Sequence, residues 1–183
     1  MKRLVSLILL LSCCLTLLSC STNNSTTNDK GQPDFPSLRE YWVIDPYGLV
    51  NQDVIEASDK VFEQLRQDNI AEIAIVIQKG IKDKGPMNDE LIWARNWGRS
   101  VKLGDKEDQR AIVWLIRPDV KPEENRITIE ISTKLTWLTV GDYGPIMEEA
   151  AEYANYDDFN GAVESLTRNT DEVLRRLWKE RNN

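Results

Sequence analysis

The chain has 183 residues, enough for one folded domain, and a formal charge of −7 from 23 basic and 30 acidic residues. This acidic balance would repel a phosphate backbone, so we expect no nucleic-acid partner. The sequence has no histidine, and its three cysteines lie at positions 13, 14 and 20. The rest of the chain therefore cannot hold a Ser-His-Asp triad, a His/Cys zinc site or a disulfide. Any metal would take oxygen ligands, which suit Ca²⁺ or Mg²⁺.

Residues 1–19 have the pattern of a signal peptide. Lys2 and Arg3 precede an apolar run, Leu4–Leu18, which is too short to predict a membrane span and is followed abruptly by polar residues. The run ends in Leu17-Leu18-Ser19-Cys20, which resembles the bacterial lipobox. This resemblance implies that Cys20 is acylated and anchors the protein in the membrane of the cell envelope, facing the periplasm or the extracellular side.

A second possible lipidation site is Cys13 in Leu10-Leu11-Ser12-Cys13, but it leaves a shorter apolar core, so Cys20 is preferred. An uncleaved anchoring helix is the other alternative, and the length of the run disfavours it. Residues 20–37 contain the lipidated cysteine and then Ser, Thr, Asn, Asp, Gly and Pro, a composition that predicts a flexible tether. Residues 38–183 remain as one folded domain.

This domain alternates between helical and strand patterns after a short apolar segment, Tyr41–Ile44, and a turn, Asp45–Gly48. Apolar spacing, helix-capping residues and β-branched runs predict seven elements. They are a helix capped by Asn51 through about Gln67, a strand at Ile70–Ile77, a helix capped by Asn88 through about Val101, strands at Ala111–Ile116 and Arg126–Ser132, and helices at about Pro145–Asn155 and Asp158–Glu180, the last with a possible break near Arg168–Thr170.

The strand patterns also predict how the sheet is built. Ile70–Ile77 and Ala111–Ile116 are nearly continuous apolar runs, typical of central parallel strands joined by a right-handed crossover. Arg126–Ser132 alternates instead, which predicts a half-exposed strand antiparallel to its predecessor. The expected fold is therefore α/β, a three-layer αβα sandwich with a small mixed, mostly parallel sheet.

Several segments, in this order, resemble the TPM domain family over nearly all of residues 41–178. Val43–Val50 is similar to the family's opening "V-x-D-x-A-G-x-L" element, and Ile73–Ile77 lies where the family has its first long strand. Further similarities are Ala94–Gly98 with Ala111–Ile116 to the "W-G" helix and central strand, Arg126–Ile131 to the "V-R-I-E-V" strand, and Asp158–Val163 to the closing helix.

The chain departs from the family at one turn. Ser132–Thr136 contains no glycine where family members usually have "G-Y-G-L-E-G", and glycine would permit positive φ and close approach of backbone to a ligand. The resemblance implies a soluble domain held near a membrane. Some members are reported as acid phosphatases or divalent-metal binders, and others serve membrane-protein repair or act as accessory subunits. The missing glycines favour a diverged or noncatalytic member.

Four acidic residues are candidate ligands for Ca²⁺ or Mg²⁺. Asp45 matches the family's opening motif, although an Asp-Pro turn also needs such a carboxylate for its own backbone. Asp105 and Asp108, with Glu107 between them, lie on a charged loop that could equally be solvated surface, and Asp142 follows Gly141. No other cofactor is expected, and no catalytic residue can be named.

The tryptophans are mostly expected in the core. Trp93, Trp97 and Trp114 have apolar neighbours, whereas Trp137 is the best candidate for an exposed anchor at a partner surface, with burial as the alternative. The favoured hypothesis is an accessory module that binds an envelope protein near the membrane. The alternative is a metal-assisted acid phosphatase that uses Asp45 with Asp105, Asp108 or Asp142.

We expect Cys20→Ala to abolish acylation and to let the precursor accumulate, because no thiol would remain at the cleavage site. Mass spectrometry of the membrane fraction measures both effects. Cys13→Ala is the matched control and should be processed normally. Normal lipidation of the Cys20 variant would refute the assignment.

Overall fold

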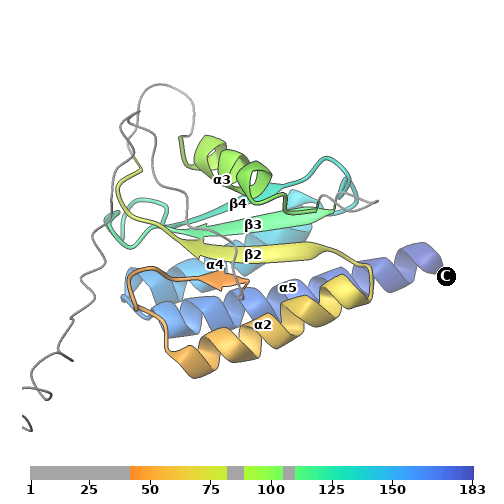
Figure 1. The fold of residues 1–183 in the computed structure, drawn as a ribbon, viewed down its shortest axis with the longest axis horizontal. Coiled ribbons are helices and arrows are strands. Elements are labelled where there is room, and N and C mark those ends of the chain that lie inside the picture. The colour runs from red at the N-terminus through yellow and green to blue at the C-terminus, as the bar shows by residue number, and fades with distance from the viewer. Residues whose placement is uncertain (1–41, 82–88, 105–109) are drawn as a thin grey trace, which may run out of the picture. The chain divides into compact units, whose positions relative to one another are not determined.

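The computed structural model describes residues 42–81, 89–104 and 110–183. These residues belong to one compact unit, residues 35–183, which contains the sheet and its helices (Figure 1). The elements in chain order are β1 (Val43–Ile44), α2 (Gln52–Gln67), β2 (Glu72–Ile77), α3 (Asp89–Ser100), β3 (Ala111–Ile116), β4 (Ile127–Ile131), α4 (Val140–Asn155) and α5 (Phe159–Asn182). Within the described residues, no helix combines the length and the apolar character needed to cross a bilayer.

The four strands form one mixed sheet in the order β1-β2-β3-β4. β1 pairs parallel with β2, and β2 pairs parallel with β3, as expected for two apolar strands joined through α3. β4 returns antiparallel to β3, with Ile131 opposite Ile112 and Ile127 opposite Ile116. The predicted mixed, mostly parallel sheet is therefore confirmed.

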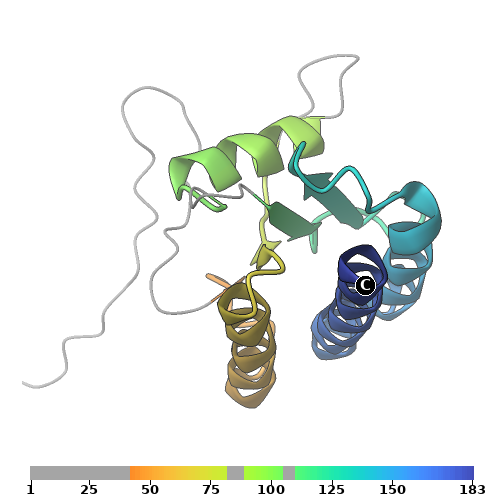
Figure 2. The ribbon, with the colours of Figure 1, turned by 90° about the vertical axis from the view of Figure 1, so that its right-hand side faces the viewer.

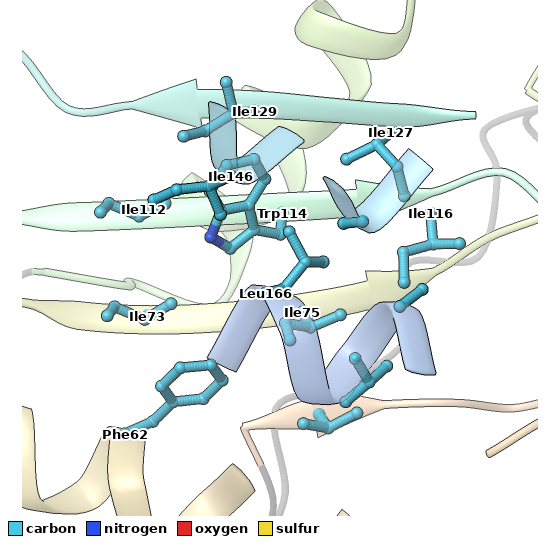
Figure 3. Close-up of a cluster of buried hydrophobic side chains, with 14 of the residues drawn as sticks. Phe62, Ile73, Ile75, Ile112, Trp114, Ile116, Ile127, Ile129, Ile146 and Leu166 are labelled. Carbon is cyan, nitrogen blue, oxygen red and sulfur yellow. The ribbon is translucent and has the colours of Figure 1, made fainter. Parts of the chain in front are cut away.

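Helices cover both faces of the sheet, which gives the predicted three layers (Figure 2). On one face, the isoleucines of β2, β3 and β4 pack with Phe62, Ile146 and Leu166 from α2, α4 and α5 (Figure 3). Trp114 lies in this core, and its indole Nε1 donates to the Thr170 hydroxyl at 3.1 Å. The central strands are buried on both sides because both of their faces carry apolar side chains.

Of the described helices, α3 is the one that covers the opposite face. Trp93 and Trp97 pack there on the alternate residues of β2 and β3, so the predicted burial of these tryptophans is confirmed. Gly98 lets the helix lie close to the sheet, since a Cβ at this position would be 3.2 Å from the Val113 side chain. The Trp-Gly pair of the sequence is thus a packing device that brings α3 against β3.

β4 is not half-exposed as its alternating pattern predicted. Thr128 is only 4% exposed, and its hydroxyl donates to Glu90 of α3 at 3.0 Å. Glu130 forms an ion pair with Arg95 of the same helix, with 2.7 Å between Arg95 Nε and Glu130 Oε1. The prediction was wrong because an alternating sequence shows only that every second side chain is polar. Here residues of α3, and not water, are the hydrogen-bond partners of those side chains.

Two helix boundaries also differ from the sequence pattern. α4 begins at Val140, ahead of Pro145, because Thr139 and Asp142 form a reciprocal capping box at its start. Gly141–Gly144, which precedes the helix predicted at about Pro145–Asn155, is therefore the first turn of this helix. α5 runs without a break through Arg168–Thr170, where its packing against α4 and the sheet is continuous.

β1 is an additional short strand that the sequence pattern did not identify. Its position depends on Asp59 of α2, whose Oδ1 accepts the backbone N–H groups of Trp42 at 2.6 Å and Val43 at 3.0 Å. Burial raises the pKa of the Asp59 carboxyl above its usual value, although these two hydrogen bonds oppose the shift. The other oxygen, Oδ2, is buried with no hydrogen-bond partner in the structure.

Thr128→Asp should destabilise the domain by roughly 3 kcal/mol or more, because it would place a second carboxylate beside Glu90 under α3. Urea denaturation measures the change in the free energy of unfolding. Thr136→Asp, at an exposed position, is the matched control and should change it by no more than about 0.5 kcal/mol. Equal stability of the two variants would mean that α3 does not cover β4.

Candidate functional site

The carboxyl ends of β1, β2 and β3 lie at one edge of the sheet, which we call the carboxyl edge. The residues that follow these strands are Asp45, Gln78 and Arg117, and β4 begins beside the last of them. Ligands of open α/β sheets bind outside the carboxyl ends of the strands. The opposite edge, which holds the amino ends of β2 and β3, is called the amino edge.

Asp45 is held by the backbone of its own turn. Its Oδ1 accepts the N–H of Tyr47 at 3.0 Å, and its Oδ2 accepts those of Leu49 at 2.5 Å and Val50 at 2.7 Å. Gly48, at φ +66°, allows the backbone to curl around the carboxylate. This is the geometry of a turn former, and a metal ion at the same oxygens would compete with three backbone donors.

Tyr47 links this turn to the segment after β2. Its hydroxyl accepts the side-chain N–H of Gln78 at 3.2 Å and the backbone N–H of Lys79 at 3.1 Å. The ammonium group of Lys79 lies 4.5 Å from the centroid of the Tyr47 ring, in position for a cation–π contact. Tyr47 is 37% exposed, and the Lys79 ammonium group lies over one face of its ring at the surface of the protein.

Arg117, directly after β3, is the central charge of the carboxyl edge and is only 5% exposed. Its guanidinium donates to Glu90 at 2.8 Å and to both oxygens of Asp119 at 3.0 and 3.2 Å. A third acceptor is the carbonyl of Ile81, at 3.2 Å. Two carboxylates therefore neutralise a buried cation, and the network joins β3 to α3 and to the segment after β2.

Asp119 is the exposed member of this network. Burial alone would raise its pKa, but hydrogen bonds from the Arg117 guanidinium and from the backbone N–H of Gly80, the latter at 2.8 Å, outweigh that effect. The pKa of Asp119 therefore lies below its usual value, and the carboxylate stays charged at neutral pH. The buried charges of the edge are thus compensated within the protein.

Three tyrosines are exposed at the carboxyl edge: Tyr47, Tyr153 at 40% and Tyr156 at 87%. The last two lie at the end of α4, and the α4–α5 turn is fixed to β4 because Arg126 donates to the Ala154 carbonyl at 2.6 Å and to Asp157 at 2.7 Å. The absence of a side chain at Gly161 makes room for the Tyr153 ring, since a Cβ there would be 2.5 Å from it.

Exposed acidic side chains lie at the same edge. The exposed carboxylates at this edge are Glu123, Glu124, Glu152, Asp157 and Asp158. Their sequence positions gave no periodic signal, because they lie on the β3–β4 connection, in the last turn of α4 and on the α4–α5 turn. Only the tertiary fold brings these segments to one edge. Chemically, the edge offers phenol rings and carboxylates for recognition of a cationic partner.

Asp142 lies at the amino edge, away from Asp45. One oxygen closes the α4 capping box by accepting the Thr139 hydroxyl at 2.7 Å and the Thr139 backbone N–H at 3.0 Å, and the other accepts from Arg176 at 3.2 Å. These bonds, those from Thr139 foremost, lower the pKa of Asp142 below its usual value. The structure therefore does not bring the two carboxylates together.

The remaining candidate ligands, Asp105 and Asp108 with Glu107, lie outside the described residues. Over residues 42–81, 89–104 and 110–183, no three His, Cys, Asp or Glu side chains are grouped so that they could hold a metal ion. Trp137 is half-buried: it packs on the core, and its ring centroid is 6.4 Å from that of Trp178. Sequence reasoning missed Arg117 and the three tyrosines, although an Arg-Pro-Asp sequence after a buried strand was a visible signal.

Comparison with known proteins supports the fold described above. A family model described as the TPM domain matches residues 43–173. The N-terminal domain of a protein from P. gingivalis is 19% identical, with a TM-score of 0.57, over 74% of this chain and 83% of that chain. The N-terminal domain of the cg2496 protein from Corynebacterium glutamicum is 14% identical, with a TM-score of 0.52, over 81% and 88% of the two chains.

A third solved structure is the BA42 protein from the psychrophilic bacterium Bizionia argentinensis. It is 9% identical, with a TM-score of 0.55, over 73% of this chain and 86% of that chain. Among curated proteins, no sequence matches this chain. At such low identities, the solved structures establish the fold alone.

We expect Asp45→Ala to lower the free energy of unfolding by about 2 kcal/mol, because three backbone N–H groups would lose their acceptor. Urea denaturation measures the loss. Glu56→Ala, on the exposed side of α2, is the control and should cost no more than about 0.5 kcal/mol.

Calorimetric titration of the wild-type protein with Ca²⁺ and with Mg²⁺ should give no saturable heat, since a cation would have to displace those donors. Saturable heat that disappears in Asp45→Ala would contradict this and would make the carboxylate a metal ligand.

Proposed function

Because the chain belongs to the TPM domain family, we propose that it is a lipid-anchored envelope protein whose domain is a noncatalytic accessory module. In this proposal, the carboxyl edge binds another envelope protein through a lysine- or arginine-rich segment. The observation that carries the proposal is Tyr156, a large aromatic side chain that is 87% exposed among carboxylates. Tyrosine is enriched at protein interfaces because it combines a large apolar ring with a polar tip.

Charge complementarity supports a cationic partner. Phenol rings attract cations over their faces, and Lys79 already takes this position over Tyr47. The carboxylates of Glu124 and Glu152 are exposed at the same edge as the tyrosines and can pair with a basic segment. Electrostatic attraction of this kind speeds the encounter and rejects acidic partners.

The noncatalytic assignment is supported by how the family-like positions are used. The Asp45 carboxylate closes its own turn, and the Arg117 guanidinium is bound by two carboxylates. The segment that lacks the family's glycines has a packing role instead, because Leu135 is 1% exposed and its N–H donates to Ser132 at 3.0 Å. That segment lies at the amino edge, beside the start of β3.

A metal-assisted acid phosphatase is the second candidate. It is favoured by the position of Asp45, which follows β1 at the carboxyl ends of parallel strands. The Ca²⁺ and Mg²⁺ titration of wild type and Asp45→Ala separates the two candidates, since only the phosphatase requires a metal at this carboxylate. Hydrolysis of a model phosphomonoester that depends on Asp45 would establish the second candidate in place of the first.

A photoreactive amino acid at position 156 should cross-link the protein to an envelope protein in living cells, because this position is the most exposed ring of the carboxyl edge. The same group at position 57, on the exposed side of α2, is the matched control and should give no adduct. Immunoblotting of the adducts measures both yields.

Charge reversal then tests the chemistry of the contact. Glu124→Lys with Glu152→Lys should lower the adduct yield about tenfold, since like charges would face each other. Glu56→Lys with Glu164→Lys is the matched reversal at exposed positions on α2 and α5. Equal yields at positions 57 and 156, or an adduct that survives reversal at the carboxyl edge, would overturn the proposal.

A further inference from the structure

The amino edge carries a cluster of apolar side chains, Trp137, Val140 and Trp178, that lies outside the proposed partner site. Trp137 precedes α4 and Trp178 lies near the end of α5, and both rings are half-buried, with 49° between their planes. Val140, the first residue of α4, is 68% exposed beside them. Figure 1 shows the carboxyl end of α5 on the same side of the sheet as the start of β2.

Basic side chains surround this group. Arg110 lies 4.7 Å from the Trp178 ring centroid, and exposed basic residues follow at Lys134, Lys179 and Arg181. Among the described residues, these last three have no carboxylate within ion-pair distance.

Several acidic residues of the described part of this edge form ion pairs with two arginines of α5. Asp68 and Asp171 pair with Arg175 at 2.6 and 2.8 Å, and Asp142 and Glu180 pair with Arg176 at 3.2 and 3.5 Å. Within the described residues, Lys134, Lys179 and Arg181 take no part in these ion pairs, whereas the exposed carboxylates named above lie at the carboxyl edge.

We infer that the amino edge rests on the anionic phospholipid surface of the membrane that holds the protein, an inference that depends on the proposed lipid anchor at Cys20. Tryptophan favours the boundary between headgroups and acyl chains, and lysine and arginine reach past it to anionic headgroups. Each basic residue near such a surface favours contact by roughly fivefold. The acidic carboxyl edge, repelled by the same surface, is turned towards the partner.

The anchor holds the domain near the bilayer but does not orient it. Residues 21–41 separate Cys20 from Trp42, and an extended chain of that length reaches at most about 75 Å. Such a tether permits either edge of the sheet to face the lipid. A modest preference of the amino edge is enough to set the orientation, because the tether has already removed most of the entropy cost of reaching the surface.

The test uses the full lipidated chain in vesicles. Val140→Cys and Tyr156→Cys, both at highly exposed positions at opposite ends of α4, are labelled with a dye whose emission shifts to the blue in apolar surroundings. The vesicles contain phosphatidylcholine with or without phosphatidylglycerol. We expect a blue shift at position 140 that requires phosphatidylglycerol and is reversed by salt, and no shift at position 156.

Charge reversal at two sites gives the matched comparison. Lys179→Glu with Arg181→Glu should lower the equilibrium constant for contact between the amino edge and the membrane by about twentyfold or more, because each basic residue contributes a factor of roughly five. Lys60→Glu with Lys121→Glu, at exposed positions outside the amino edge, should leave the shift unchanged. A shift at position 156, a shift without phosphatidylglycerol, or no shift at either position would overturn the inference.

Two further outcomes are distinguished by the same samples. A shift that grows with protein density at constant lipid would show that a second copy of the chain covers the amino edge, and it would overturn the membrane contact. The mass of the purified protein reports acylation of Cys20 independently of the dye. A protein without acyl chains refutes the anchor and its dependent inference, whereas an acylated protein without a shift refutes the orientation alone.

Discussion

The buried guanidinium of Arg117 is the charge around which the carboxyl edge is assembled. A cation in this position is tolerated only when carboxylates and carbonyls replace the water it has lost, and here Glu90, Asp119 and the Ile81 carbonyl do so. Each of these groups lies on a different part of the chain. The requirement to neutralise one charge therefore fixes the start of α3 and the segments after β2 and β3 in one arrangement.

The same network explains why Thr128 of β4 is shielded from water. Glu90 accepts from Thr128 with one oxygen and from Arg117 with the other, so α3 brings its own hydrogen-bond partners to the sheet. Gly98 removes the side chain that would hold α3 away from β3. Close packing and polar pairing thus act together on this face, and neither would be sufficient alone.

Apolar periodicity was enough to predict the central strands, their parallel pairing and the helices on both faces, because burial of both faces is a property of the local sequence. Apolar periodicity could not predict the solvent exposure of β4, because the exposure of Thr128 depends on α3, a helix from elsewhere in the chain. A capping box formed by Thr139 and Asp142 determines the start of α4 and the role of Asp142. Both residues were visible in the sequence, but they were not recognised as a capping box. The grouping of tyrosines at the carboxyl edge could not be predicted from the sequence, because Tyr47 and Tyr156 are over a hundred residues apart.

If the proposed lipid anchor holds the protein by its amino-terminal segment, the attachment of β1 has a mechanical consequence. A pull on that segment enters the fold at Trp42, whose N–H and that of Val43 are bound to the single carboxylate of Asp59. Behind it, only the two residues of β1 pair with β2, whereas β2 and β3 share a six-residue parallel ladder. Tension would therefore release β1 and the Asp45 turn first, and the ladder between β2 and β3 would stay paired.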